Sequence, residues 1–98
     1  QGQTGKVDGA ILLQAKKLWH QNPDSALGLS QQYLQTAIQH NDEVEMAKAW
    51  NSIGVCQLFL SDYFSARVSF EKALYAFRKT GTIKGVADAE NNIALVYE

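Results

Sequence analysis

The chain has 98 residues and a formal net charge of −1, and 46% of its residues are hydrophobic. This length supports one small domain with a modest core. The near-neutral charge lacks the basic surface that neutralises phosphates, so we expect no nucleic-acid partner. The sequence contains no apolar run of about 20 residues, so we expect no membrane insertion in this segment. The single cysteine excludes an internal disulfide.

The first half of the chain predicts two helices. Residues 1–6 are polar and glycine-rich, and we interpret them as a disordered tail or a tag remnant. Apolar side chains then recur every three or four positions over 11–19, which is typical of one face of a helix. A second helix is predicted to begin with Asn22 as N-cap and Pro23 at the first helical position, because proline has no N–H to leave unbonded there.

Short turn signals separate three further helices. Asp42 followed by Glu45 gives the third helix an Asp-x-x-Glu start, and this helix runs to about residue 60. Ser61 or Asp62 is expected to cap the fourth helix, and Gly81 to end it in the left-handed conformation. Thr82 is the expected cap of a fifth helix over 83–98. No segment alternates with the period of a strand, so the predicted fold class is all-α, with antiparallel neighbouring helices.

A shift of 40 residues aligns the chain with itself. It places AKAWNSIGVCQ (47–57) on ADAENNIALVY (87–97), and Gly54 meets Ala94. The identical pairs are Ala47/Ala87, Ala49/Ala89, Asn51/Asn91 and Ile53/Ile93. Such a period indicates stacked helix hairpins. We therefore predict a single domain over 7–98, built from a hairpin over 7–40, a complete unit over 42–80 and the first helix of a further unit over 83–98.

The segment 47–74 resembles a tetratricopeptide repeat (TPR). Trp50, Ile53 and Gly54 stand in the spacing of the family's W-x-x-[LI]-G motif, and Tyr63 follows at the turn between the helices. The remaining matches to the family pattern are Ala66, Phe70, Ala73 and Leu74. The resemblance implies a right-handed superhelix of antiparallel hairpins, about two and a half of them here, with these residues packing the helices together.

The sequence departs from the family pattern in two places. Gln57 stands where the family usually has tyrosine, and the proline that usually ends the 34-residue unit is absent. The longer unit is similar to the 40-residue subclass found in bacterial sensor kinases, TPR-fused regulators and kinesin light chains.

Glycine inside a helix costs about 1 kcal/mol relative to alanine. We interpret Gly54 as a point of close approach to Ala66 on the partner helix, because packed helix axes lie about 8–10 Å apart. Cys56, on the same helix, is interpreted as a small packed hydrophobe and not as a reactive thiol. His20, His40 and Cys56 lack a chelating spacing, so we expect no metal site.

Catalytic motifs are not evident in the sequence. The glycines at 2, 5 and 9 follow no strand, so they do not form a dinucleotide-binding loop. Carboxylates such as Glu43 and Asp88 stand near helix starts, where the helix dipole favours negative charge. We therefore predict that the chain is not an enzyme, with no catalytic residues and no cofactor.

Stacked hairpins form a concave groove lined by the first helix of each unit. The repeat register assigns to it Lys48, Asn51, Ser52, Val55, Leu58 and Phe59 from the central unit, Asp88, Asn91, Asn92 and Leu95 from the next, and roughly Ile11, Leu12, Ala15, Leu18 and Trp19 from the first. Asn51 and Asn91 share a register, so we expect them to form a ladder of amides that bonds a peptide backbone. Polarity of the helix surface or capping within the stack is the alternative for these asparagines, and core packing is favoured for Phe59 and Trp19.

The sequence therefore predicts a module that binds a protein or a peptide in this groove, a sensory or scaffolding part of a larger bacterial signalling protein. The alternative is a structural stacking or self-association element with no peptide ligand. The fifth helix has no partner after it, so we expect a homo-oligomer through 83–98 or fraying of that end. The expected location is cytoplasmic, with a periplasmic sensor region as the alternative.

Overall fold

The computed structural model describes residues 7–97, and every regular element in that range is a helix. The elements are α1 (Ala10–Leu18), α2 (Pro23–Gln39), α3 (Glu43–Phe59), α4 (Tyr63–Thr80) and α5 (Ile83–Val96). The predicted all-α class is confirmed. The interpretation of residues 1–6 as a tail or tag remnant lies outside the described residues, and α5 ends at Val96 instead of continuing to 98.

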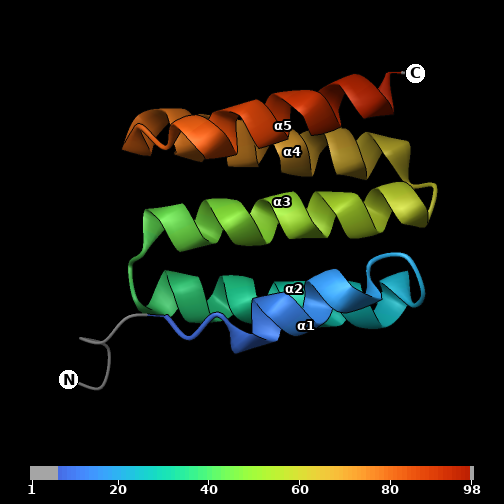
Figure 1. Cartoon of the computed structure of the whole chain (residues 1–98), viewed down its shortest axis with the longest axis horizontal. Helices are drawn as coiled ribbons and strands as arrows, with labels where there is room; N and C mark the ends of the chain where they lie inside the picture. Colours follow the sequence, from blue (N-terminus) through green and yellow to red (C-terminus); the bar gives the residue numbers. More distant parts are fainter. Residues whose placement is uncertain (1–6, 98) are drawn as a thin grey trace.

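The helices form a stack of antiparallel hairpins (Figure 1). α1 and α2 make the first hairpin, α3 and α4 the second, and α5 lies at the end of the stack against α4. α3 is the central helix, because it packs against both α2 and α4 and also touches α1 and α5. The first helices α1, α3 and α5 therefore lie along one face of the stack.

Side-chain caps begin three of the helices at the predicted residues. The side chains of Asn22, Asp42 and Asp62 each accept a bond from the backbone N–H three positions later, at 3.2, 3.2 and 3.4 Å. Pro23 is the first residue of α2. These caps satisfy N–H groups that have no partner inside the helix, which fixes where each helix starts.

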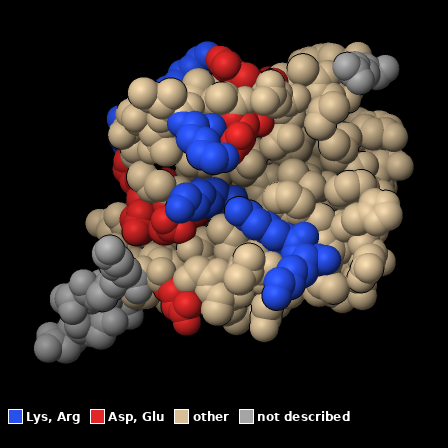
Figure 2. All heavy atoms as spheres, viewed as in Figure 1, with Lys and Arg blue, Asp and Glu red and all other residues tan. Residues whose placement is uncertain are grey.

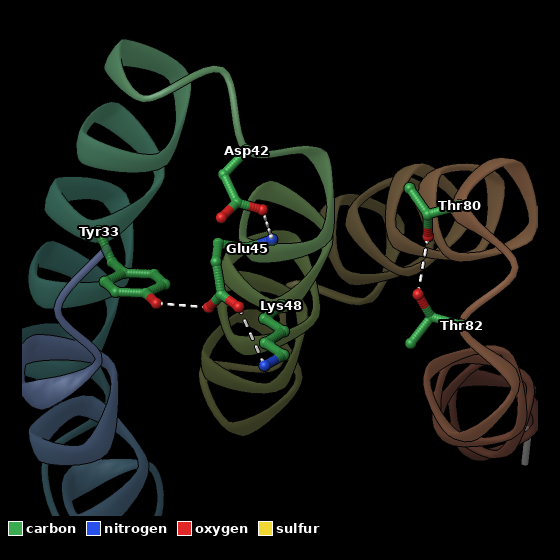
Figure 3. Close-up of polar contacts among 6 residues, drawn as sticks. All are labelled: Tyr33, Asp42, Glu45, Lys48, Thr80 and Thr82. Atoms are coloured by element: carbon green, nitrogen blue, oxygen red, sulfur yellow. Dashed lines mark hydrogen bonds and ion pairs between the residues drawn. The ribbon is translucent and has the colours of Figure 1, made fainter. Parts of the chain in front are cut away.

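One predicted cap is wrong, and the Asp-x-x-Glu start of α3 does not form a reciprocal capping box. Thr82 occupies the N-cap position of α5, but its hydroxyl bonds the Thr80 hydroxyl at 2.8 Å and makes no cap to α5 (Figure 3). Glu45 does not bond back to the Asp42 N–H, which donates instead to the Ala37 carbonyl at 3.0 Å. The carboxylate of Glu45 bonds to other residues, as described below.

All three turns between α2 and α5 share one geometry, although the sequence predicted it only at Gly81. Asn41, Ser61 and Gly81 have φ angles of 57°, 63° and 71°, in the left-handed region. In each turn the next residue donates its N–H to the carbonyl five positions earlier, at 2.9–3.0 Å. This is the Schellman arrangement, in which glycine is preferred because it has no Cβ.

Ser61→Gly is therefore expected to stabilise the fold by about 0.5–1 kcal/mol, since it removes the cost of a left-handed serine. For a domain of this size the melting temperature should rise by about 2–8 °C. Ser25→Gly is the matched control: Ser25 is exposed in the first turn of α2, where glycine should lower the melting temperature. Thermal unfolding followed by circular dichroism measures both changes, and a Ser61→Gly protein that melts lower would contradict the prediction.

The core consists of large side chains set against very small ones. A Cβ built on Gly54 would lie 2.5 Å from the Cε1 atom of Phe70, and one built on Gly85 would overlap the ring of Phe77 even more closely. Both rings come from α4, and both are almost fully buried. The close approach predicted at Gly54 therefore exists, but the nearest atoms are those of the Phe70 ring and not Ala66, which is buried in the same cluster.

The other predicted packing residues differ in depth. Ile53 and Ala73 are buried, Trp50 and Leu74 are partly buried, and Tyr63 is exposed at the start of α4. The prediction that Tyr63 packs the helices together is wrong, because 53% of its surface remains open to solvent.

Candidate binding groove

A groove of about 760 Å³ runs over the face formed by α1, α3 and α5. Figure 2 shows this face, with basic and acidic side chains side by side where α3 and α5 begin and further basic side chains over α1. The residues that line the groove are Gly9, Leu12, Lys16, Trp19, Tyr33, Val44, Glu45, Lys48, Asn51, Ser52, Val55, Phe77, Thr82, Lys84, Gly85, Asp88, Asn91 and Asn92.

Most of the predicted groove residues lie in this lining. The structure brings together Lys48, Asn51, Ser52 and Val55 from α3, Asp88, Asn91 and Asn92 from α5, and Leu12 and Trp19 from the first hairpin. It leaves out Leu58, Phe59, Leu95, Ile11, Ala15 and Leu18. The prediction for these six residues is not supported by this lining.

The structure shows where four of the residues left out lie. Leu58 packs against the core cluster of Val55, Ala66 and Phe70. Phe59 is 47% exposed and meets the edge of the His20 ring, with 5.5 Å between ring centroids. Ala15 is fully buried and Leu95 is half exposed. The favoured interpretation of Phe59 as a core residue is therefore wrong.

The predicted ladder of asparagines is offset by one residue. Asn92, and not Asn91, donates its Nδ2 hydrogen to the Asn51 Oδ1 atom, at 2.9 Å, and thereby links α5 to α3. Asn91 is exposed on the groove lining. The pair leaves the side-chain Nδ2 hydrogens of Asn51 and the side-chain Oδ1 atom of Asn92 without a partner among the described residues, so both groups can bond a ligand.

A buried chain of hydrogen bonds holds the floor of the groove. The Trp19 indole N–H donates to the Ser52 hydroxyl at 2.8 Å, and Ser52 lies 2.7 Å from Ser30. The Ser30 hydroxyl donates to the Ala26 carbonyl at 2.8 Å, so the proton between the serines comes from Ser52. This chain connects α1, α3 and α2. Ser52 is fully buried and engaged, so it positions Trp19 and does not itself face a ligand.

A second polar cluster forms the wall of the groove near the start of α3 (Figure 3). The buried Tyr33 hydroxyl donates to Glu45 Oε1 at 2.5 Å, and Lys48 Nζ lies 3.1 Å from Glu45 Oε2. Burial raises the pKa of Tyr33, and the bond to Glu45 and its charge raise it further, so the phenol stays neutral. No pattern in the sequence indicated that Tyr33 and Glu45 belong to the groove.

Lysines from three helices line the groove. Lys16 comes from α1, Lys48 from α3 and Lys84 from α5. Lys48 is paired with Glu45, and Lys84 lies 3.0 Å from Asp88, whereas Lys16 makes no ion pair with any described residue. Lys16 is therefore the cation of the groove that is most available to an acidic ligand.

Chemically reactive groups are scarce in the part of the chain that is described. Cys56 is fully buried, and burial raises the pKa of its thiol, so the nucleophilic thiolate is disfavoured. Within residues 7–97 no three His, Cys, Asp or Glu side chains lie close enough to hold a metal ion. None of the described helices combines the length and the apolar character needed to cross a membrane.

The chain matches no protein-family model, and no curated protein or solved structure is significantly similar to it.

Proposed function

We propose that the chain is a non-catalytic protein-interaction module of the TPR type, and that it binds an extended peptide across α1, α3 and α5. The observation that carries this proposal is the groove itself, which three helices line with amides and lysines. In the groove Glu45 pairs with Lys48 and Asp88 pairs with Lys84, and the one thiol is buried, so the groove is equipped to bind rather than to react.

The spacing of the helices defines the length of the peptide that the groove can hold. Packed helices lie about 8–10 Å apart, and an extended chain advances about 3.3 Å per residue, so one helix corresponds to three peptide residues. A segment of about six residues would cross from α1 to α5. Asn51 and Asn92 would bond its backbone, and Lys16 would meet an acidic side chain or a C-terminal carboxylate.

The resemblance to the 40-residue TPR subclass supports a place for this module in a larger bacterial signalling or regulatory protein, where it would act in sensing or as a scaffold. Both the cytoplasm and the periplasm are compatible with this role. A purely structural stacking element is the second candidate, and it is favoured by the uncovered outer face of α5, where Ile83 and Tyr97 are 85% and 68% exposed.

Screening a library of six-residue peptides, with free or amidated C-termini, tests the proposed function. We expect acidic peptides to be selected, and fluorescence anisotropy should show that Asn51→Ala weakens their binding about 2- to 10-fold, the value of one or two lost hydrogen bonds. Lys16→Gln should weaken binding about 2- to 5-fold, as for an exposed ion pair, and the effect should fade at high salt.

Lys17→Gln is the matched control for charge, because Lys17 is the next residue of α1 but does not line the groove. It should bind like the unmodified protein. Equal losses in the Lys16 and Lys17 variants, or a library from which no peptide is selected, would contradict the proposal.

A further inference from the structure

The outer side of α5 carries an exposed stripe along its whole length. Ile83 and Tyr97 stand at its two ends, 85% and 68% exposed, and Ala87, Glu90 and Ala94 lie between them, also exposed. The spacings of four, three, four and three residues place all five on one side of a helix. No described helix covers this side, since α5 packs only against α4 and α3 (Figure 1).

The internal repeat shows what this side of a helix does elsewhere in the same molecule. The positions 40 residues earlier lie on α3, on the side that packs against α4. Glu43, the counterpart of Ile83, stays exposed but pairs with Lys79 of α4 at 3.0 Å. Ala47 packs with Phe77, and Gly54 lies under the ring of Phe70. Ser69 donates to the side chain of Gln57, the counterpart of Tyr97, at 2.7 Å. The equivalent stripe on α3 is thus a helix-binding surface, and we expect the stripe on α5 to pack against a helix in the same way.

The order of residues in the stripe points to a second α5 as the occupant. Ile83 lies seven residues before Glu90 and Tyr97 seven after it, while Ala87 and Ala94 lie three before and four after. The stripe therefore reads nearly the same in both directions. An antiparallel pair about a two-fold axis near Glu90 places Ile83 against Tyr97 of the second copy and Ala87 against Ala94. The small alanines permit the close approach of the axes.

Charge complementarity supports the same arrangement. Glu90 lies 3.1 Å from Arg78 of α4, and both side chains are more than half exposed. Two Glu90 carboxylates near a two-fold axis would repel each other, but each brings its own Arg78. The four side chains can then alternate in sign, so that each arginine bonds two carboxylates. The centre of the surface is electrically balanced only because both residues are present.

We propose that α5 is a homodimerisation helix, and that two copies of this chain pair through Ile83, Ala87, Glu90, Ala94 and Tyr97 in antiparallel orientation, with Arg78 completing the centre. Asp88 and Asn92, which line the groove, lie on other sides of α5 because each residue turns the helix by about 100°. The groove therefore remains open in the dimer, and the proposal is independent of the peptide ligand.

A charge-exchange experiment tests this proposal by sedimentation equilibrium. The unmodified protein should sediment at twice the mass of one chain. Glu90→Arg and Arg78→Glu should each sediment as monomers, because four like charges meet at the axis, whereas an equal mixture of the two should form a heterodimer. Circular dichroism establishes that each variant is folded. A monomeric unmodified protein, or a mixture that stays monomeric, would overturn the proposal.

Single-cysteine variants test the orientation. A mixture of Ala87→Cys and Ala94→Cys should give a heterodimeric disulfide, while each variant alone should not. In the antiparallel pair two copies of position 87 are separated by about 10 Å along the helices, beyond the roughly 7 Å limit between Cα atoms in a disulfide. Cys56 is buried and does not compete. Disulfides formed by either variant alone, or none in the mixture, would overturn the antiparallel arrangement.

A different occupant would be recognised with a synthetic peptide of residues 62–81, the sequence of α4 with its caps. If this peptide binds the α5 face of a chain that remains monomeric, the face belongs to the second helix of a hairpin and the homodimer proposal is wrong. If the peptide binds only weakly and competes with dimerisation, the homodimer proposal stands.

Discussion

Gly54→Leu is expected to destabilise the fold by about 1–2 kcal/mol, in spite of the better helix propensity of leucine. Leucine would gain about 0.8–1 kcal/mol in the helix interior. Its Cβ, however, would lie 2.5 Å from a ring carbon of Phe70, and Phe70 is fully buried, so the ring cannot turn away into solvent. Overpacking of this kind usually costs about 1–3 kcal/mol and sometimes more. The clash therefore outweighs the propensity, and the melting temperature should fall by about 4–16 °C.

The same substitution at Gly28 is the matched control. Gly28 lies inside α2 and is exposed, and a Cβ added there would have no neighbouring atom within 4 Å. Gly28→Leu should therefore stabilise the fold by about 0.5–1 kcal/mol. Urea unfolding of both variants measures the two free energies. Similar changes in the two proteins would show that close packing at Gly54 is unimportant. A double variant, Gly54→Leu with Phe70→Ala, should regain part of the loss if the two side chains compete for one space.

The features that depend on local chemistry were predictable from the sequence. The caps at Asn22, Asp42 and Asp62 follow from side chains that bond N–H groups three residues away, and those contacts exist whatever the rest of the fold does. The helical class follows from periodicity, and the 40-residue period identified the stack. Gly54 could be recognised as a packing point because glycine lowers the stability of a helix interior, and a close packing contact offsets that loss.

The features that depend on how helices are rotated against each other were not predictable. Gly54 lies against Phe70 and not Ala66, and Asn51 bonds Asn92 and not Asn91. One residue turns a helix by about 100°, so a repeat register alone cannot determine which of two neighbouring side chains reaches across. Gly85, which lies against the Phe77 ring of α4, was not predicted as a packing point.

The groove contains both residues that the sequence could predict and residues that it could not. The repeat identified Lys48 and Asn51 on α3 and their neighbours on α5, because these positions recur with the period. Lys16 and Tyr33 reach the groove from the first hairpin, whose match to the repeat is weaker, and the fold alone brings them there. The longer reach of a lysine side chain also allows Lys84 to line the groove from the first turn of α5.

Phe77→Ala is expected to cause a loss of about 3–5 kcal/mol, the cost of emptying a buried aromatic site. Phe77 is the one large side chain in a buried cluster that otherwise consists of Ala47, Ala73 and Ala89. Its ring also covers Gly85, and so it connects α3, α4 and α5. Without the ring, alanines and a glycine would face one another across a space that they are too small to fill. Denaturant unfolding measures this loss.

Tyr75→Ala on the same helix provides the control, since Tyr75 is 71% exposed and should cost less than about 1 kcal/mol. The loss of stability in Phe77→Ala should also be unequal between the helices. Because Phe77 packs the first half of α5 onto the core through Gly85 and Ala89, hydrogen exchange should accelerate more in α5 than in α2. Asp88 and Asn92 reach the groove from α5, so the proposed peptide binding should weaken even where the remaining hairpins stay folded. Uniform acceleration across α2 and α5, or a loss no larger than that of Tyr75→Ala, would show that α5 is held by other contacts.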